Sequence, residues 1–284
     1  MRIIDAEKSN IDYTQYVKRG ARESDYSTLI TGDCLVRVDG KPRILYKKIE
    51  SLDTRYVRQA VKNIKYATGT RTGGLKTTSR IFGYSPRNTI RQNFCSATSL
   101  AVEQPTEHSI ICDFGSELAE FYVEYFPEVY QKHKKEVDEK IKSDWVIQGS
   151  PFTSGIVNKN NPLKYHFDAG NMKNVLSNMV VFKRNTSGGY LSCPEFDIGF
   201  EVADNTVILF DGQNILHGVT PITKHSKDSY RYSIVYYTLK QIWRCEPLEM
   251  ELALIRQDRE NRETKRANGE RDVDLVKQSK KSEA

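Results

Sequence analysis

The sequence predicts an α+β fold in which helices from the N-terminal half cover an antiparallel sandwich or barrel formed by the C-terminal half. Two patterns indicate this division. Between Glu107 and Ile141, apolar side chains recur at spacings of three and four, as on the buried face of a helix: Leu118, Phe121, Tyr122, Tyr125 and Phe126. From Val146 onward, short β-branched and aromatic runs are separated by turn residues, which is typical of an antiparallel sandwich or barrel.

The N-terminal elements can be assigned in chain order. Residues 1–50 combine short apolar runs with turn signals such as TGD and VDGKPR, which predicts a few short strands. Helical periodicity follows at 52–66. Residues 67–88 are rich in Gly, Thr, Ser and Arg without an apolar period, so we expect a loop that carries cations.

The C-terminal half contains five strand-like runs and a charged tail. The runs are LSNMVVF, GGYLSCPEF, IGFEVA, NTVILF and RYSIVYYTL. After Trp243 an amphipathic helix begins and fades into a charged, aromatic-free end, whose last fifteen or so residues we expect to be disordered. We divide the chain into a basic N-terminal region that packs on the core (1–78), the core domain (79–245) and a charged helical tail (246–284).

Composition limits the class of protein. The chain of 284 residues can form one large domain or two modest ones with a buried core. It has no run of eighteen apolar residues, and its acidic start is unlike a signal peptide, so we expect neither a membrane span nor secretion. Its five cysteines are scattered and free of CxxC, which indicates neither a disulfide framework nor a structural zinc site. We therefore expect a reducing, intracellular location.

Positive charge is concentrated in one segment of the chain. No acid lies between Asp53 and Glu103, where nine basic residues occur: Arg55, Arg58, Lys62, Lys65, Arg71, Lys76, Arg80, Arg87 and Arg91. A groove that follows a polyanion would explain this run, because Lys and Arg neutralise phosphates and release condensed counterions. An ordinary solvated basic face is the alternative.

His166 and Asp168, two residues apart, form the first part of a candidate metal site. On an extended strand both side chains face the same way and can share one ion. His217 follows an apolar strand and a polar turn, so it can return to this pair across a sheet. Two histidines and one carboxylate form the facial triad of non-haem Fe(II) oxygenases, which leaves three coordination positions open. Each residue alone has an ordinary structural explanation, and only their joint occurrence indicates a site.

Arg231 and Ser233 lie fourteen residues beyond His217 on one face of the strand YRYSIVYY. A guanidinium and a hydroxyl can together hold a carboxylate. A dicarboxylic 2-oxo acid fits this arrangement, with one end chelating the iron and the other meeting Arg231. A buried ion pair of Arg231 with Asp211 or Asp228 is the alternative. A zinc hydrolase would give Arg231 no role and lacks a general-base glutamate beside the ligands.

The strings GGYLSCPEFDIGFEVADNTVILFDGQNILHGVTPI and YRYSIVYY contain these residues, and SRIFGYSPRNTIRQNFC and PFTSGIVNKNNPLKYHFDAGN precede them. Over these stretches, about residues 79–243, the chain resembles the oxygenase domain of the TET/JBP family, especially its compact phage and bacterial members. Those enzymes use Fe(II) and 2-oxoglutarate to hydroxylate the 5-methyl group of pyrimidines in DNA. The resemblance implies a double-stranded β-helix (jelly-roll) oxygenase core with flanking N-terminal helices.

The resemblance implies a role for each matching residue. His166, Asp168 and His217 become the catalytic Fe(II) ligands, and Arg231 with Ser233 binds the distal carboxylate of 2-oxoglutarate. Asn171 falls where the family has an asparagine that contacts the target base, and Arg87 or Arg91 falls near a second co-substrate arginine. Leu239 replaces a base-contacting histidine of the animal enzymes, whose cysteine-rich zinc region and long insert are also absent, so the identity of the base stays open.

The resemblance implies a dioxygenase, an oxidoreductase that consumes O2 and acts on DNA as a duplex with a flipped base or as a single strand. Conversion of 5-methylcytosine to 5-hydroxymethylcytosine is favoured, and thymine to 5-hydroxymethyluracil is next. Tyr165, Phe167 and Tyr237 either stack on the base or simply pack in the core. The alternatives are oxidation of a free nucleotide or other small molecule, and a non-catalytic DNA-binding β-sandwich. We expect a bacterial or phage-infected cytoplasm rather than a nucleus.

Overall fold

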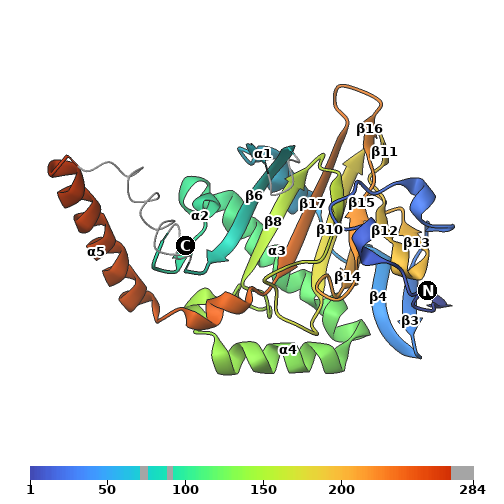
Figure 1. Ribbon diagram of the computed structural model, residues 1–284, viewed down its shortest axis with the longest axis horizontal. Helices are drawn as coiled ribbons and strands as arrows, with labels where there is room; N and C mark the ends of the chain where they lie inside the picture. Colours follow the sequence, from blue (N-terminus) through green and yellow to red (C-terminus); the bar gives the residue numbers. More distant parts are fainter. Residues whose placement is uncertain (71–75, 88–91, 270–284) are drawn as a thin grey trace.

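A computed structural model describes residues 1–70, 76–87 and 92–269. Two β-sheets pack against each other around an apolar core, and helices α1 (Arg55–Asn63) and α3 (Pro105–Tyr125) cover the outer face of the larger sheet (Figure 1). The predicted α+β class with a jelly-roll core and flanking helices is therefore confirmed. Among the described helices, none is both long and apolar enough to span a membrane.

The larger sheet joins strands from both ends of the chain. Within the described residues it has ten strands, nine of them in one path. Their order is β1 (Arg2–Asp5), β3 (Cys34–Val38), β4 (Lys41–Lys48), β14 (Thr206–Phe210), β10 (Ser177–Arg184), β17 (Tyr230–Tyr237), β8 (Ser154–Lys159), β6 (Lys76–Ser85) and β5 (Ala67–Thr70), and β7 (Ser96–Ala97) pairs with β6. The predicted short N-terminal strands thus extend the sheet beside β14.

The smaller sheet carries two of the candidate site residues. Its strand order is β2 (Thr28–Ile30), β13 (Ile198–Phe200), β12 (Leu191–Cys193), β15 (His217–Val219) and β9 (Leu163–His166). A separate ribbon consists of β11 (Thr186–Gly188) and β16 (Ile222–Lys224). Because β15 and β9 are antiparallel neighbours, His217 lies directly opposite His166.

The predicted helical segment 107–141 is divided into two helices, α3 and α4 (Pro127–Lys140). The division falls at Phe126, because the residue before a proline is disfavoured in helical conformation and Pro127 is suited to a first helical turn. The other helices are α2 (Ser99–Glu103), α5 (Leu248–Ala267) and the short 3-10 turns η1 (Tyr13–Gln15), η2 (Glu23–Asp25), η3 (Ser143–Trp145), η4 (Pro194–Phe196) and η5 (Lys240–Arg244). Helix α5 extends away from the body of the molecule (Figure 1).

The expectation of a loop at 67–88 is wrong for most of that segment. Strands β5 and β6 form an antiparallel pair there, and β6 also pairs with β8. Phe82 of β6 is fully buried against Tyr236 of β17. A strand inside a large sheet obtains its hydrogen bonds from distant neighbours, so a polar local composition does not prevent it from forming. Residues 71–75 and 88–91, and the tail expected to be disordered, lie outside the described residues.

One disulfide joins cysteines that the sequence did not indicate as a pair. Cys95 and Cys245 are 150 residues apart, whereas Cys34, Cys112 and Cys193 are unpaired in the described part of the chain. Beside the disulfide, the fully buried carboxylate of Glu251 accepts hydrogen bonds from the backbone N–H groups of Cys95 and Glu246. These contacts attach the start of α5 to the segment that follows β6.

Candidate active site

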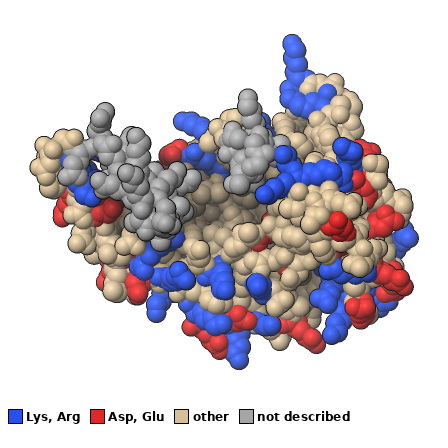
Figure 2. All heavy atoms as spheres, in the orientation of Figure 1, with Lys and Arg blue, Asp and Glu red and all other residues tan. Residues whose placement is uncertain are grey.

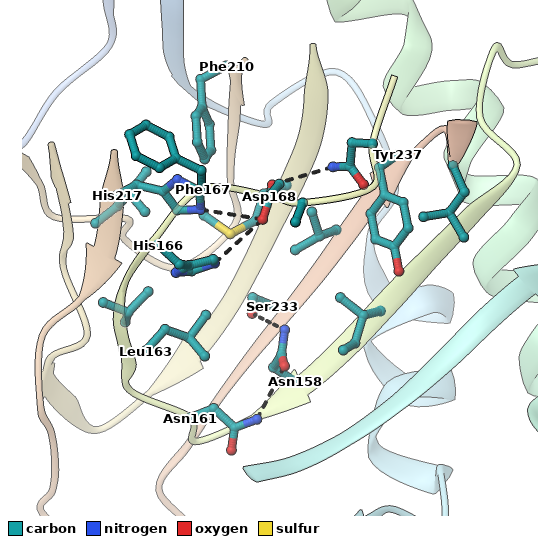
Figure 3. Close-up of a pocket in the computed structure, with 18 of the residues that line it drawn as sticks. Asn158, Asn161, Leu163, His166, Phe167, Asp168, Phe210, His217, Ser233 and Tyr237 are labelled. Atoms are coloured by element: carbon teal, nitrogen blue, oxygen red, sulfur yellow. Dashed lines mark hydrogen bonds and ion pairs between the residues drawn. The ribbon is translucent and has the colours of Figure 1, made fainter. Parts of the chain in front are cut away.

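The two sheets bring His166, Asp168 and His217 together. His166 ends β9, His217 begins β15, and Asp168 follows β9 by two residues. The His166 Nε2 atom lies 3.5 Å from Asp168 Oδ1, and His217 Nε2 lies 3.7 Å from the same oxygen (Figure 3). One ligand atom from each of the three residues can be chosen so that all lie within 4.8 Å of one another. That spacing lets a single metal ion reach all three.

Hydrogen bonds orient both imidazoles for metal binding. The Nδ1 atom of His166 is 2.7 Å from the carbonyl oxygen of Lys164, and that of His217 is 2.9 Å from the carbonyl oxygen of Ile215. An N–H at each Nδ1 donates to these oxygens and leaves the Nε2 lone pair facing Asp168. Burial, reinforced by the neighbouring His166, lowers the pKa of His217 to about 4. His217 is therefore neutral at neutral pH, which is the form that binds a metal.

Residues outside this triad hold its backbone in place. Leu216, immediately before His217, donates its N–H to the buried carboxylate of Glu195 at 2.8 Å. The N–H of Asp168 donates to the carbonyl of Gly212 at 2.8 Å. A Cβ atom at Gly212 would collide with the Asp168 carboxylate, so only glycine allows this approach. Glu195 and Gly212, both from the string GGYLSCPEFDIGFEVADNTVILFDGQNILHGVTPI, thus support the triad.

Arg231 on β17 is a buried cation that forms no ion pair with any residue that the structure describes. Its side chain is 2% exposed, and its Nε and Nη2 atoms form no hydrogen bond with any described residue. Burial lowers its pKa to about 10, so it remains charged at neutral pH. Asp228 pairs with Arg184, and Asp211 accepts hydrogen bonds from its own loop. The alternative of a buried ion pair with either aspartate is thus not found.

Arg231, Ser233 and the triad line one cavity of about 300 Å³. Gly189 makes room for the guanidinium, since a Cβ atom there would lie 2.8 Å from Arg231 Nε. A buried cation lacking a counterion needs an anion, and a triad that can hold a metal faces the same space. The donor set therefore fits Fe(II) together with a dicarboxylic 2-oxo acid.

The remaining predicted pocket residues take different positions. Asn171, Leu239, Phe167 and Tyr237 line the cavity, and the Asn171 amide lies 3.5 Å from Asp168 Oδ2. Tyr165 is instead fully buried, with its hydroxyl bonded to Ser192 and Asp25, so the core-packing explanation holds for this residue.

The structure does not bring Arg87 to the cavity lining. Arg87 forms an ion pair with the buried Glu251, and Arg91 lies outside the described residues. Other cations of the acid-free segment are neutralised in the same way: Arg55 pairs with Asp53, Arg58 with Asp204 and Arg80 with Glu103. The count of basic residues therefore overstates the positive charge that this segment can offer a polyanion. Figure 2 shows Lys and Arg side chains near a hollow in one face of the molecule.

Two asparagines of the cavity were not predicted from the sequence. Asn158 lies directly opposite Ser233 in the β8–β17 register, and Asn161 follows β8 (Figure 3). The string NKNNP contains both, but amides in such a string are typical of turns, and no local pattern assigns them to a site. Pairing of β8 with β17, the strand of Arg231 and Ser233, would have been the signal.

Three features define the class of 2-oxoglutarate- and Fe(II)-dependent dioxygenases, which also consume O2: the jelly-roll core, the histidine–aspartate–histidine triad, and a buried arginine with no acidic partner in the described part of the chain. Residues 81–240 match the Tet_JBP family, described as the oxygenase domain of the 2OGFeDO superfamily, and the chain belongs to this family. The predicted family, enzyme class and cofactors are thus confirmed.

Two relatives extend this comparison. The chain is 26% identical over 168 residues, 58% of its length, to thymine dioxygenase JBP1 of Trypanosoma brucei brucei. It spans only 19% of that protein. The solved structure of NgTET1 in complex with 5mC DNA matches with a TM-score of 0.57 at 13% identity, covering 81% of this chain and 90% of that one. This second match shows a shared fold.

Proposed function

We propose that the chain hydroxylates the 5-methyl group of a pyrimidine in DNA, with 5-methylcytosine the favoured base and thymine the second. The observation that carries the oxygenase chemistry is a shared cavity in which the triad faces Arg231, a buried cation with no acidic partner among the described residues. DNA as the substrate is supported by the family and by two relatives, one named a thymine dioxygenase and the other solved with 5mC DNA.

The chain's own residues have distinct tasks in this reaction. His166, Asp168 and His217 would hold the iron, and Arg231 with Ser233 would bind the distal carboxylate of 2-oxoglutarate. Bound together with O2, these cofactors supply an oxidant strong enough to break a methyl C–H bond. Arg231 is buried at the cavity, so it can orient the co-substrate by binding its distal carboxylate there.

The target base must leave the DNA stack to reach this cavity. Phe167 and Tyr237 line the cavity with aromatic rings on which an extruded base can stack. The amide of Asn171 lies beside Asp168 and offers both a donor and an acceptor to the Watson–Crick edge of a pyrimidine. Asn171 is therefore our candidate for base recognition beside the metal.

The first experiment is to incubate the protein with Fe(II), 2-oxoglutarate, O2 and DNA, and to identify the digested nucleosides by mass spectrometry. Matched duplexes and single strands would be used with and without 5-methylcytosine. Formation of 5-hydroxymethylcytosine only from methylated DNA supports the cytosine proposal, whereas 5-hydroxymethyluracil from unmodified DNA supports thymine. Succinate formation without either product would contradict DNA as the substrate and favour a small molecule.

Salt dependence of binding provides a second test against the small-molecule alternative. A protein that contacts several phosphates loses DNA affinity steeply as salt rises, because releasing the same condensed counterions into a more concentrated salt solution gains less entropy. We expect such a loss between low and moderate salt, measured by fluorescence anisotropy with a labelled duplex. Weak binding that hardly changes with salt would contradict a DNA-binding face.

A further inference from the structure

Asn158 occupies a position in the cavity that the established family assignment leaves without a role. It lies on β8 opposite Ser233 of β17, so their side chains share the face of the sheet that looks into the cavity. The residue is 5% exposed. A buried amide is costly unless it is hydrogen-bonded, so the partners of Asn158 determine which of its atoms faces the co-substrate end of the site.

The orientation of Asn158 is determined by the residue behind it. Asn161 Oδ1 accepts from the Thr78 N–H at 2.8 Å, and Asn161 Nδ2 donates to the Thr78 carbonyl at 2.9 Å. These two bonds to the β6 backbone determine which end of the Asn161 amide is the nitrogen. The same Nδ2 donates to Asn158 Oδ1 at 3.2 Å. The oxygen of Asn158 is therefore directed toward Asn161.

The nitrogen of Asn158 is consequently directed toward the clamp for the co-substrate. Its Nδ2 atom donates to Ser233 Oγ at 3.4 Å (Figure 3). Because Ser233 accepts this bond, its own O–H can donate to a ligand. The neighbouring Asn160 holds the Arg231 backbone, accepting from Arg231 N–H at 2.7 Å and donating its own N–H to the Arg231 carbonyl at 2.8 Å. One short segment, residues 158–161, thus supports both Arg231 and Ser233.

We propose that Asn158 is a positioning residue for 2-oxoglutarate. Its amide nitrogen donates to the Ser233 oxygen and so leaves the Ser233 O–H to donate to the distal carboxylate beside Arg231. Donors beside the guanidinium bind an anion, whereas a carbonyl oxygen there would repel one. This inference rests on the 2-oxoglutarate assignment and is independent of the nucleic-acid substrate.

The test measures co-substrate binding without turnover. Mn²⁺ replaces iron, DNA is omitted, and the Kd of 2-oxoglutarate is obtained by isothermal titration calorimetry. In Asn158→Asp, the introduced carboxylate competes with the ligand for Arg231 and repels it, so we expect Kd to rise by at least about tenfold. The same carboxylate provides the buried guanidinium with a counterion, so the thermal midpoint Tm of the ligand-free protein does not fall.

A matched variant separates this role from a structural one. Asn178→Asp makes the same change in β10 of the same sheet, where the Asn178 amide donates to the Leu118 carbonyl on the helix-covered face. We expect it to lower Tm and to leave the Kd of 2-oxoglutarate within about twofold of wild type. The proposal is supported if Asn158→Asp raises Kd without lowering Tm, whereas Asn178→Asp lowers Tm without raising Kd.

A second substitution covers the case in which Asn158→Asp does not fold. Asn158→Leu keeps a similar side-chain volume but removes the amide, and we expect Kd to rise by about fivefold or more. A Kd within about twofold of wild type in either folded Asn158 variant would overturn the proposal. The proposal would also be overturned if Asn158→Asp lost affinity while its Tm fell by as much as the Tm of Asn178→Asp.

Discussion

Strand β17 has two faces that differ in composition and in hydrogen bonding. Its odd-numbered residues line the cavity, whereas Tyr232, Ile234 and Tyr236 pack in the core beneath the helices. On the core face, the Tyr236 hydroxyl donates to the Ile111 carbonyl at 2.7 Å. On the cavity face, Arg231 keeps two buried nitrogens without a partner among the described residues. Successive side chains of β17 thus alternate between two roles: one face stabilises the fold, and the other lines the ligand cavity.

This difference shows that the cavity face is maintained at a cost to folding. A buried charge without a counterion destabilises the ligand-free protein, whereas apolar burial on the other face stabilises it. Substitutions on the two faces should therefore have different effects. Those on the core face should lower stability, and those on the cavity face should lower turnover or affinity.

The largest effect is expected for Asp168→Ala on the cavity side. Removing the only carboxylate of the triad should abolish turnover, because two histidines alone bind the metal poorly. The thermal midpoint and the affinity for DNA should stay near wild type. Succinate release, thermal unfolding and fluorescence anisotropy with labelled DNA measure the three quantities. The exposed Asp228→Ala is the control that keeps activity. Retained activity would exclude Asp168 as a ligand.

The core face should respond to Ile234→Ala with lost stability. Ile234 is fully buried, and truncating such a side chain leaves a cavity that costs about 3.5 kcal/mol of unfolding free energy. The Kd of 2-oxoglutarate should hardly change, since the neighbouring odd-numbered side chains point the other way. Urea unfolding and calorimetry would measure both. An equal loss of affinity would mean that the two faces are coupled.

Arg231→Met should have the opposite effect to Ile234→Ala: it should lower affinity but not stability. We expect 2-oxoglutarate affinity to fall by about 100-fold, because charge-assisted hydrogen bonds to the distal carboxylate are lost. The ligand-free protein should keep or gain stability, since an unpartnered buried charge is removed. Calorimetry and thermal unfolding are the measurements. A fall of several kcal/mol in unfolding free energy would instead reveal a structural partner of Arg231.

The smallest effect is expected for the part of the pH dependence of stability that His133 causes. This residue contacts Thr238, which directly follows β17. Its Nε2 lies 2.8 Å from Thr238 Oγ1, and burial lowers its pKa to about 3. The folded state therefore favours the neutral ring. Its stabilising contribution is complete above the unfolded pKa of about 6.5 and falls as pH decreases, by about 2 kcal/mol at pH 5.

His133→Gln removes this titration while keeping an amide donor for Thr238. Urea unfolding at several pH values would compare the variant with wild type, because His217 and His108 also have lowered pKa values and contribute equally to both. The difference in unfolding free energy between the two proteins should shift by about 2 kcal/mol between pH 8 and pH 5. A constant difference would show that the ring is already charged in the folded protein.

Local pattern alone was enough to identify the strand-rich half, the two-residue spacing of His166 and Asp168, and the shared face of Arg231 and Ser233. These features depend on periodicity, which is a property of consecutive residues. The same reasoning failed for β6, where composition indicated a loop and pairing with β8 produced a strand.

Only the tertiary structure decided which groups are paired. It neutralised Arg87 with Glu251, joined Cys95 to Cys245, and placed Asn158 against Ser233, while it left Arg231 without an acid among the described residues. Each of these outcomes depends on contacts between residues more than seventy positions apart, and the register of such contacts is set by the packing of whole sheets. A sequence can indicate that a residue is able to bind an anion, but whether a protein carboxylate already satisfies it is decided by the packed structure.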